Sequence, residues 1–329
     1  MANLMDSIHP SPLEHGVRPD FLLHTLRMVA ITCAVMLIGL TSGLAQESAS
    51  ILLPLPLHTD HNREIPLREL RDGRLESSLL RTLNKNPKWN TLIASKKMSV
   101  GLVDLQDPFL ARFAQVNGDE MMYAASLPKI AIFLAAMDAL EKKELPDTRE
   151  IRQDMRLMIS RSDNEASTRM IDRLGYDKIA NVLTEPKYGL YDAQHGGGLW
   201  VGKRYAYSGQ RNPDPIKGLS HAATASQVCR FYHLMVQGRL VNWDRSRQML
   251  DIMANPELHH KFVNTLEQIA PQAQLFRKSG SWQNFHSDSI LVWGADRRYI
   301  LVALTEDPDG EKIMRELVLA VEEVLHANK

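Results

Sequence analysis

The sequence has little cysteine and no excess of charge of either sign. Only Cys33 and Cys229 occur in 329 residues, which excludes a disulfide scaffold and a zinc site made of cysteines. The 39 basic side chains balance 39 acidic ones, so the basic patch typical of nucleic-acid-binding proteins is not expected. A hydrophobic fraction of 44% is ordinary for a globular protein. Stability is therefore expected to come from a hydrophobic core.

The N-terminal region contains an uncharged, apolar run from Met28 to Leu44. Arg18 and Arg27 precede the run, and Ala45 follows it, which is the pattern of a secretory signal peptide. The run is at the short limit of the roughly 17–25 residues that cross a bilayer, so an uncleaved membrane anchor is the alternative. Residues 46–64 are rich in Pro, His and Asn and predict a linker. We expect a protein exported to the periplasm or beyond the cell.

Residues 65–329 predict one domain of the α/β class, in which strands flank a helical region. Apolar spacing predicts helices over 66–85, 127–143, 148–160, 165–174, 177–184 and 309–327, and strands over 98–105, 109–116, 274–282, 288–293 and 298–305. The Thr224–Gln227 segment fits a capping box that opens a further helix. We expect an α+β, two-subdomain fold: an antiparallel five-stranded sheet with the N- and C-terminal helices packed on it (65–125 and 266–329), and an inserted all-helical subdomain (126–265).

The first chemical motif is Ser126-Leu127-Pro128-Lys129, at the start of the first inserted helix. A serine hydroxyl needs a nearby base to act as a nucleophile. Side chains three residues apart share a helix face, so Lys129 is expected within hydrogen-bonding reach of Ser126. Partial burial near a helix N-terminus favours a neutral amine, which is able to act as that base. Taken alone, the motif also fits an N-cap serine followed by a solvated lysine.

Two further motifs follow in the chain. Ser162-Asp163-Asn164 lies between two predicted helices, where it offers a second hydroxyl and an amide, although all three residues also favour helix N-caps.

Lys278-Ser279-Gly280, followed by Ser281, starts the last three strands. A cation and hydroxyls on a strand edge suit a substrate carboxylate, and Gly280 permits close approach to the backbone. The plain alternative is a basic strand with a glycine bulge.

Each motif occurs once, in this order and in these settings, and the combination resembles the penicillin-recognising serine hydrolases. The order of predicted elements looks most like that of class A β-lactamases, over most of residues 65–329. The resemblance implies that Ser126 is acylated by a β-lactam or a D-alanyl-D-alanine peptide, with Lys129 as base and Ser162 as proton donor. Asn164, Lys278, Ser279 and Gly280 would bind the substrate. The N–H groups of Ser126 and Ser281 would form the oxyanion hole.

The sequence departs from that pattern after the middle motif. Class A enzymes carry a glutamate there that activates the deacylating water, but residues 193–213 contain no acidic side chain. Glu185, Asp192 and His195 lie nearby, and none matches the motif. A water without a positioned base typically loses 10²–10⁴-fold in rate, so acylation is expected to outpace deacylation.

The leading hypothesis is an exported serine hydrolase of the class A β-lactamase type. A peptidoglycan DD-peptidase (a penicillin-binding protein) or another acyl hydrolase is the second. The third is a catalytically idle envelope binding module that uses the Trp200 and Tyr205 region. We expect a small-molecule substrate, a monomer, no nucleic acid, no cofactor, and membrane contact only through the N-terminal segment. No metal is expected either, because the adjacent His259 and His260 do not share a helix face.

Overall fold

The computed structural model describes residues 53–57 and 65–328. The predicted signal peptide or anchor, 1–45, and the predicted linker apart from residues 53–57 therefore lie outside the described residues. The helices are η1 (Leu67–Leu70), α2 (Gly73–Asn84), α3 (Pro87–Ala94), α4 (Lys129–Glu141), α5 (Arg149–Ser160), α6 (Asn164–Leu174), α7 (Tyr176–Thr184), η2 (Ala193–His195), α8 (Ala225–Val236), α9 (Trp243–Met253), α10 (Phe262–Ile269) and α11 (Gly310–Ala327). The strands are β1 (Met98–Asp104), β2 (Arg112–Val116), β3 (Met122–Tyr123), β4 (Tyr191–Asp192), β5 (Gly197–Gly198), β6 (Trp200–Val201), β7 (His221–Ala223), β8 (Gln274–Trp282), β9 (Phe285–Trp293) and β10 (Arg298–Glu306).

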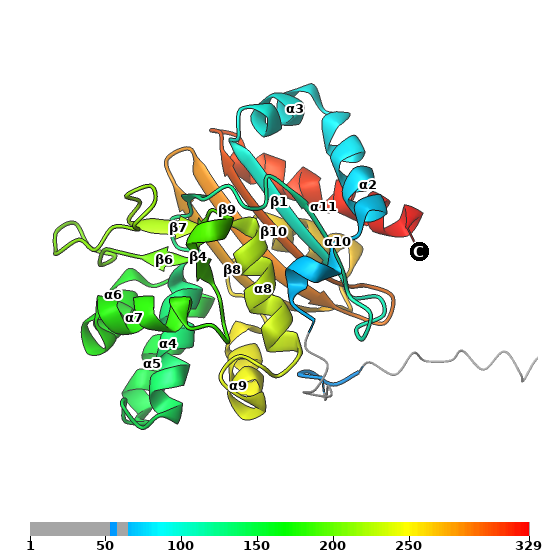
Figure 1. The fold of residues 1–329 in the computed structure, drawn as a ribbon. Coiled ribbons are helices and arrows are strands. Elements are labelled where there is room, and N and C mark those ends of the chain that lie inside the picture. Colours follow the sequence, from blue (N-terminus) through cyan, green and yellow to red (C-terminus); the bar gives the residue numbers. More distant parts are fainter. Residues whose placement is uncertain (1–52, 58–64, 329) are drawn as a thin grey trace, which may run out of the picture. The chain divides into compact units, whose positions relative to one another are not determined.

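The central sheet has the strand order β2-β1-β10-β9-β8 (Figure 1). Every neighbouring pair in it is antiparallel. This confirms the α/β fold class and the five-stranded antiparallel sheet expected from the sequence. Strand β8, which carries the third motif, is an edge strand, so one side of it is available to other groups.

Helices cover both faces of the sheet because successive strand side chains point to opposite faces. In β10, Leu301 and Ala303 pack in one core with apolar residues of α2, α10 and α11. Ile300 and Val302 pack in the other core with α4 and α8. Figure 1 shows α8 crossing the near face of the sheet and α11 behind it. The N- and C-terminal helices thus pack on the same face of the sheet, and α4 and α8 of the inserted region lie on the other.

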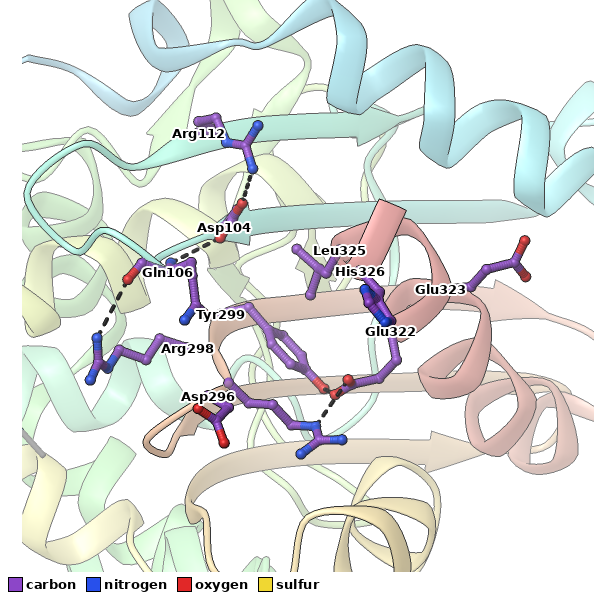
Figure 2. A pocket seen from close by; sticks show the side chains of 11 residues that line it. Asp104, Gln106, Arg112, Asp296, Arg298, Tyr299, Glu322, Glu323, Leu325 and His326 are labelled. Carbon is purple, nitrogen blue, oxygen red and sulfur yellow. Dashed lines mark hydrogen bonds and ion pairs between the residues drawn. The ribbon is translucent and has the colours of Figure 1, made fainter. Parts of the chain in front are cut away.

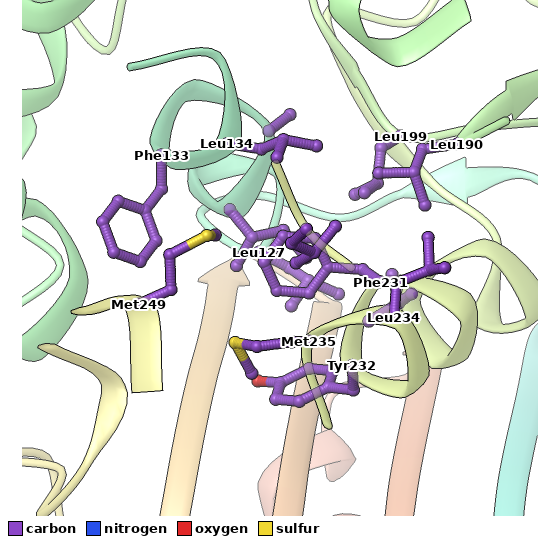
Figure 3. Close-up of a cluster of buried hydrophobic side chains, with 14 of the residues drawn as sticks. Leu127, Phe133, Leu134, Leu190, Leu199, Phe231, Tyr232, Leu234, Met235 and Met249 are labelled. Carbon is purple, nitrogen blue, oxygen red and sulfur yellow. The ribbon is translucent and has the colours of Figure 1, made fainter. Parts of the chain in front are cut away.

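Helix α4 is the centre of the inserted region. All side chains from Lys129 to Leu140 are buried, which is the pattern of a helix surrounded by protein. Leu127, just before the helix, lies in the same core and is fully buried. Figure 3 shows it near Phe231 of α8. The turn that carries the first motif is therefore anchored in the core by the residue that follows Ser126.

Several boundaries differ from the predictions for local reasons. The helix expected over 66–85 is interrupted because the Asp72 side chain accepts hydrogen bonds from Arg74 N and Leu75 N and starts α2 there. Strand β2 begins late because Asp107–Leu110 forms a turn, with Leu110 N bonded to Asp107 O at 3.1 Å. The inserted region, expected to be all-helical, also contains the short strands β4 to β7.

The helix start predicted at Thr224 is confirmed, since Thr224 is the N-cap of α8 and its hydroxyl accepts a hydrogen bond from Gln227 N at 3.3 Å. Among the described residues, the reciprocal bond from Thr224 N to the Gln227 side chain, which would complete a capping box, is not formed. Within the residues that the structure describes, no helix is both long enough and apolar enough to cross a membrane.

Candidate active site

Ser126 lies in the turn between β3 and α4, and it lines a cavity of about 580 Å³. We call this the Ser126 cavity. Its lining comprises Tyr123, Ala125, Ser126, Asn164, Lys203, Arg204, Tyr205, Ala206, Tyr207, Ser220, His221, Ser281 and Trp282. Ser126 is not the helix N-cap, because Pro128 holds that position. The preceding residue, Ala125, has a φ of 50°, a strained conformation for a side chain other than glycine.

Lys129 is fully buried and is not a solvated charge. Its Nζ donates to Ser162 O at 2.5 Å and to Asn164 Oδ1 at 2.8 Å, and it lies 3.4 Å from Ser162 Oγ. Among the hydrogen bonds of residues 65–328, none joins the Lys129 amine to the Ser126 hydroxyl, a contact that the helix spacing had predicted. Burial lowers the pKa of Lys129 to about 7, against the opposing effect of the Asp163 charge.

The Ser162 hydroxyl brings the second and third motifs together. Lys278 Nζ donates to Ser162 Oγ at 2.9 Å. Lys278 is buried, and burial, with a smaller contribution from Lys129, lowers its pKa well below the usual value. Ser162 has a φ of 58°, so the loop holds this hydroxyl between two amines in a strained backbone conformation. Asp163 is the N-cap of α6, its Oδ1 accepting from Ala166 N at 2.6 Å.

The third motif lies directly against the Ser126 turn. A Cβ added to Gly280 would lie 2.5 Å from Ser126 N and 2.4 Å from Ala124 O. Only glycine fits this contact without movement of the backbone. The pairing of β8 with β9 is continuous from Gln274 to Trp282, so the alternative of a glycine bulge is wrong. Ser281 lines the Ser126 cavity, whereas Ser279 is buried.

Residues 193–213, the glycine-rich stretch without acidic side chains, contact the site through Tyr205. The Tyr205 ring centre lies 4.4 Å from Lys129 Nζ, and its hydroxyl donates to Ala125 O at 3.2 Å. The ring of His221 packs at 4.3 Å from that of Tyr205. Burial lowers the pKa of His221 to about 4, so this histidine is neutral at pH 7. His221 was not predicted, because the two- and three-residue strands β6 and β7 are too short to show a period.

The described residues that line the Ser126 cavity include no carboxylate. Of the acidic candidates near the middle of the chain, Asp192 pairs with His195 at 2.6 Å and Glu185 pairs with Lys187 at 3.1 Å. Neither carboxylate, nor His195, lines the cavity. The lining instead combines cationic groups, aromatic rings and hydroxyls around Ser126.

A second cavity of about 510 Å³ lies elsewhere, and none of the three motifs contributes to it (Figure 2). Two ion pairs lie within its lining. Glu322 accepts from Arg297 and from the Tyr299 hydroxyl, and Asp104 accepts from Arg112. This self-pairing indicates a structural network.

Known proteins share the sequence pattern and the fold. The model of a family described as the beta-lactamase enzyme family matches residues 146–325, which contain the second and third motifs. A β-lactamase from Sphaerobacter thermophilus DSM 20745 has a TM-score of 0.60 and 17% identity, with 76% of this chain and 97% of that chain covered. PBP-A has a TM-score of 0.58 and 18% identity, with 78% and 97% covered. None of the curated protein sequences matches this chain. At these identities, the structural likeness establishes the fold.

Proposed function

Since this chain belongs to the beta-lactamase enzyme family, we propose that it is an exported serine hydrolase that is acylated at Ser126 by β-lactams or related acyl amides. The observation that carries the proposal is the position of the Ser162 hydroxyl. It lies 2.9 Å from Lys278 Nζ and 3.4 Å from Lys129 Nζ. Lys129 Nζ also bonds to Asn164 Oδ1, and Asn164 lines the same cavity as Ser126 and Ser281. Three motifs distant in the sequence thus offer a nucleophile, a base and a proton relay.

The chemistry follows from these contacts. A pKa of about 7 leaves a large share of Lys129 neutral at physiological pH, and a neutral amine accepts the proton of the Ser126 hydroxyl. Ser126 Oγ bonds to the substrate carbonyl carbon, and the C–N bond then breaks. Ser162 Oγ gives its proton to the leaving nitrogen and regains one from Lys129 or Lys278. The N–H groups of Ser126 and Ser281 stabilise the intermediate oxyanion, an effect worth about 3–4 kcal/mol per donor in comparable enzymes.

Deacylation is expected to be the slow step, because the described lining of the Ser126 cavity holds no carboxylate. The attacking water then lacks the strong general base that speeds hydrolysis by typically 10²–10⁴-fold. Water has to rely on Lys129, which recovers its neutral form after the leaving group has been protonated. We therefore expect a long-lived acyl-enzyme and weak turnover.

The direct test is intact-mass spectrometry over time after addition of benzylpenicillin to the purified protein. We expect one adduct of the full mass of the drug, mapped to Ser126 and decaying over hours. Ser126→Ala should form no adduct. The matched control is Ser220→Ala, because Ser220 is another hydroxyl that lines the same cavity. Absence of both adduct and nitrocefin hydrolysis from the wild-type protein would overturn the proposal.

A DD-peptidase is the second candidate, because a lining whose described residues supply no carboxylate for the attacking water argues against rapid β-lactam hydrolysis. Release of D-alanine from muropeptides at a rate above that of nitrocefin hydrolysis would identify this activity.

The third candidate, an idle binding module, predicts that Ser126→Ala keeps all ligand binding and that the wild type forms no adduct.

Export is also part of the proposal, and it depends on the apolar run from Met28 to Leu44. We expect a reporter enzyme fused after residue 64 to reach the periplasm. The control is the same fusion with residues 28–44 deleted, which should stay in the cytoplasm because the apolar segment is lost. Retention of the complete fusion in the cytoplasm would contradict export.

A further inference from the structure

Lys261 is a buried lysine that belongs to none of the three motifs. It precedes α10, has no exposed surface, and adopts a φ of 56°. Its Nζ donates to Gly280 O at 2.6 Å and to Ser287 O at 3.0 Å. Both acceptors are backbone carbonyls of the paired strands β8 and β9, in which Gly280 lies opposite Ser287.

The first of these carbonyls belongs to the peptide unit that ends in the N–H of Ser281. In a trans peptide, the C=O and N–H groups point in opposite directions. Gly280 O points toward Lys261 and Ser287, so the N–H of Ser281 points away from these two residues. Strand β8 is an edge strand, and Gly280 packs closely against Ser126 N. The N–H expected in the oxyanion hole is thus on the same peptide that Lys261 binds.

Ser287 links this peptide to the nucleophile turn. Its Oγ donates to Ala124 O at 2.8 Å and lies 3.4 Å from Gly280 O. Lys261 and Ser287 together therefore fix β8 relative to Ala124, two residues before Ser126. The N–H of Ser126 is the other expected oxyanion donor.

The surroundings of Lys261 leave its charge directed at these carbonyls. Asp288, the carboxylate that acts most strongly on this charge, is bound by Arg277 through two hydrogen bonds of 2.8 Å and by Phe262 N at 3.1 Å. Burial lowers the pKa of Lys261 to about 8, which still leaves it mainly protonated at pH 7. Burying a lone ammonium is costly, and hydrogen bonds from charged groups are stronger than neutral ones. The two carbonyls therefore hold Lys261 in place, and Lys261 holds them.

We propose that Lys261 is a positioning residue that orients the Gly280–Ser281 peptide and polarises its N–H toward the oxyanion. This inference rests on the proposed acyl-enzyme chemistry. An ammonium on the carbonyl oxygen withdraws electron density from the peptide nitrogen and strengthens its N–H as a donor. Losing Lys261 is expected to cost less than the 10²–10³-fold effect of removing an oxyanion donor, and we expect about a tenfold slower acylation.

The test compares Lys261→Met and Lys261→Gln with Thr265→Val. Met keeps the length of the side chain without a donor, whereas Gln keeps a neutral donor if the Met variant fails to fold. Thr265 is the matched control, because it lies on α10 and donates to Arg315 O at 3.0 Å, away from β8. The readouts are the acylation rate with benzylpenicillin, the infrared stretch of the isotope-labelled acyl carbonyl, and the amide resonance of ¹⁵N-labelled Ser281.

We expect both Lys261 variants to acylate more slowly, with the acyl carbonyl band at higher frequency and the Ser281 amide proton shifted upfield. Thr265→Val should leave all three readouts unchanged. Wild-type acylation rate and an unmoved Ser281 resonance in the Lys261 variants would overturn the inference, as would equal changes in Thr265→Val. If the wild type forms no adduct, the proposed function fails, while the Ser281 resonance still decides whether Lys261 polarises this peptide.

Discussion

The aromatic ring of Tyr205 lies over the ammonium group of Lys129, with 4.4 Å between the ring centre and Nζ. The Tyr205 hydroxyl also donates a hydrogen bond to Ala125 O. One side chain thus contacts Lys129, the last residue of the first motif, and Ala125, the residue just before the motif. Tyr205 comes from the stretch that carries no acidic residue. The ring covers Lys129 Nζ and so contributes to its burial, and burial is what lowers the pKa of this amine.

Replacing Tyr205 with alanine should therefore slow acylation at neutral pH. Without the ring, water reaches Lys129, the pKa of the amine rises, and a smaller fraction is neutral at pH 7. The measurement is the pH profile of the acylation rate. We expect its rising limb near pH 7 in the wild type and at higher pH in Tyr205→Ala. Tyr205→Phe keeps the ring and should retain the wild-type midpoint; a shift of the same size in both variants would refute this explanation.

Lys129 should also make the stability of the protein depend on pH. Its pKa is about 7 in the folded protein and near 10.5 when unfolded, so between these values the unfolded chain binds more protons. Stability then rises with pH across this window. We expect the unfolding free energy of the wild type to gain on that of Lys129→Met as the pH is raised from about 7 to about 9.5, as measured by urea denaturation. A difference that does not change with pH would show that Lys129 has an ordinary pKa.

Gly280→Ala should impair both the site and the fold. The new Cβ would lie 2.5 Å from Ser126 N, so either β8 or the nucleophile turn has to move. Overpacking of this kind costs about 1–3 kcal/mol, and we expect acylation to fall roughly 100-fold because an oxyanion donor is displaced. Gly73→Ala is the control, since a Cβ there meets nothing within 4 Å. Acylation of Gly280→Ala at the wild-type rate would contradict the close contact.

The sequence predicted most of the central sheet and most of the longer helices, because long strands and helices have clear apolar periods. It also predicted motifs that the fold brings together, since short motifs are readable without tertiary contacts. It did not predict α3, α9, α10 or the buried position of Lys261. The contact of Tyr205 with Lys129 depends on how a glycine-rich loop packs, and His221 depends on a three-residue strand. Such features are fixed by contacts between distant residues and leave no local pattern.

Ser162→Ala provides the sharpest separation of the proton relay from the nucleophile. The variant keeps Ser126 and Lys129 but removes the hydroxyl that Lys278 binds at 2.9 Å. Loss of a positioned proton donor typically costs 10²–10⁴-fold, so we expect slower acylation by that factor with a stable fold. Stopped-flow mixing with a fluorescent penicillin gives the rate. Ser160→Ala is the control, because this hydroxyl lies two residues earlier and bonds to the exposed Glu257 at 2.9 Å, whereas the Ser162 hydroxyl contacts Lys129 and Lys278. If Ser162→Ala acylates as fast as Ser160→Ala, the leaving nitrogen receives its proton from another group, and Lys278 or solvent becomes the candidate.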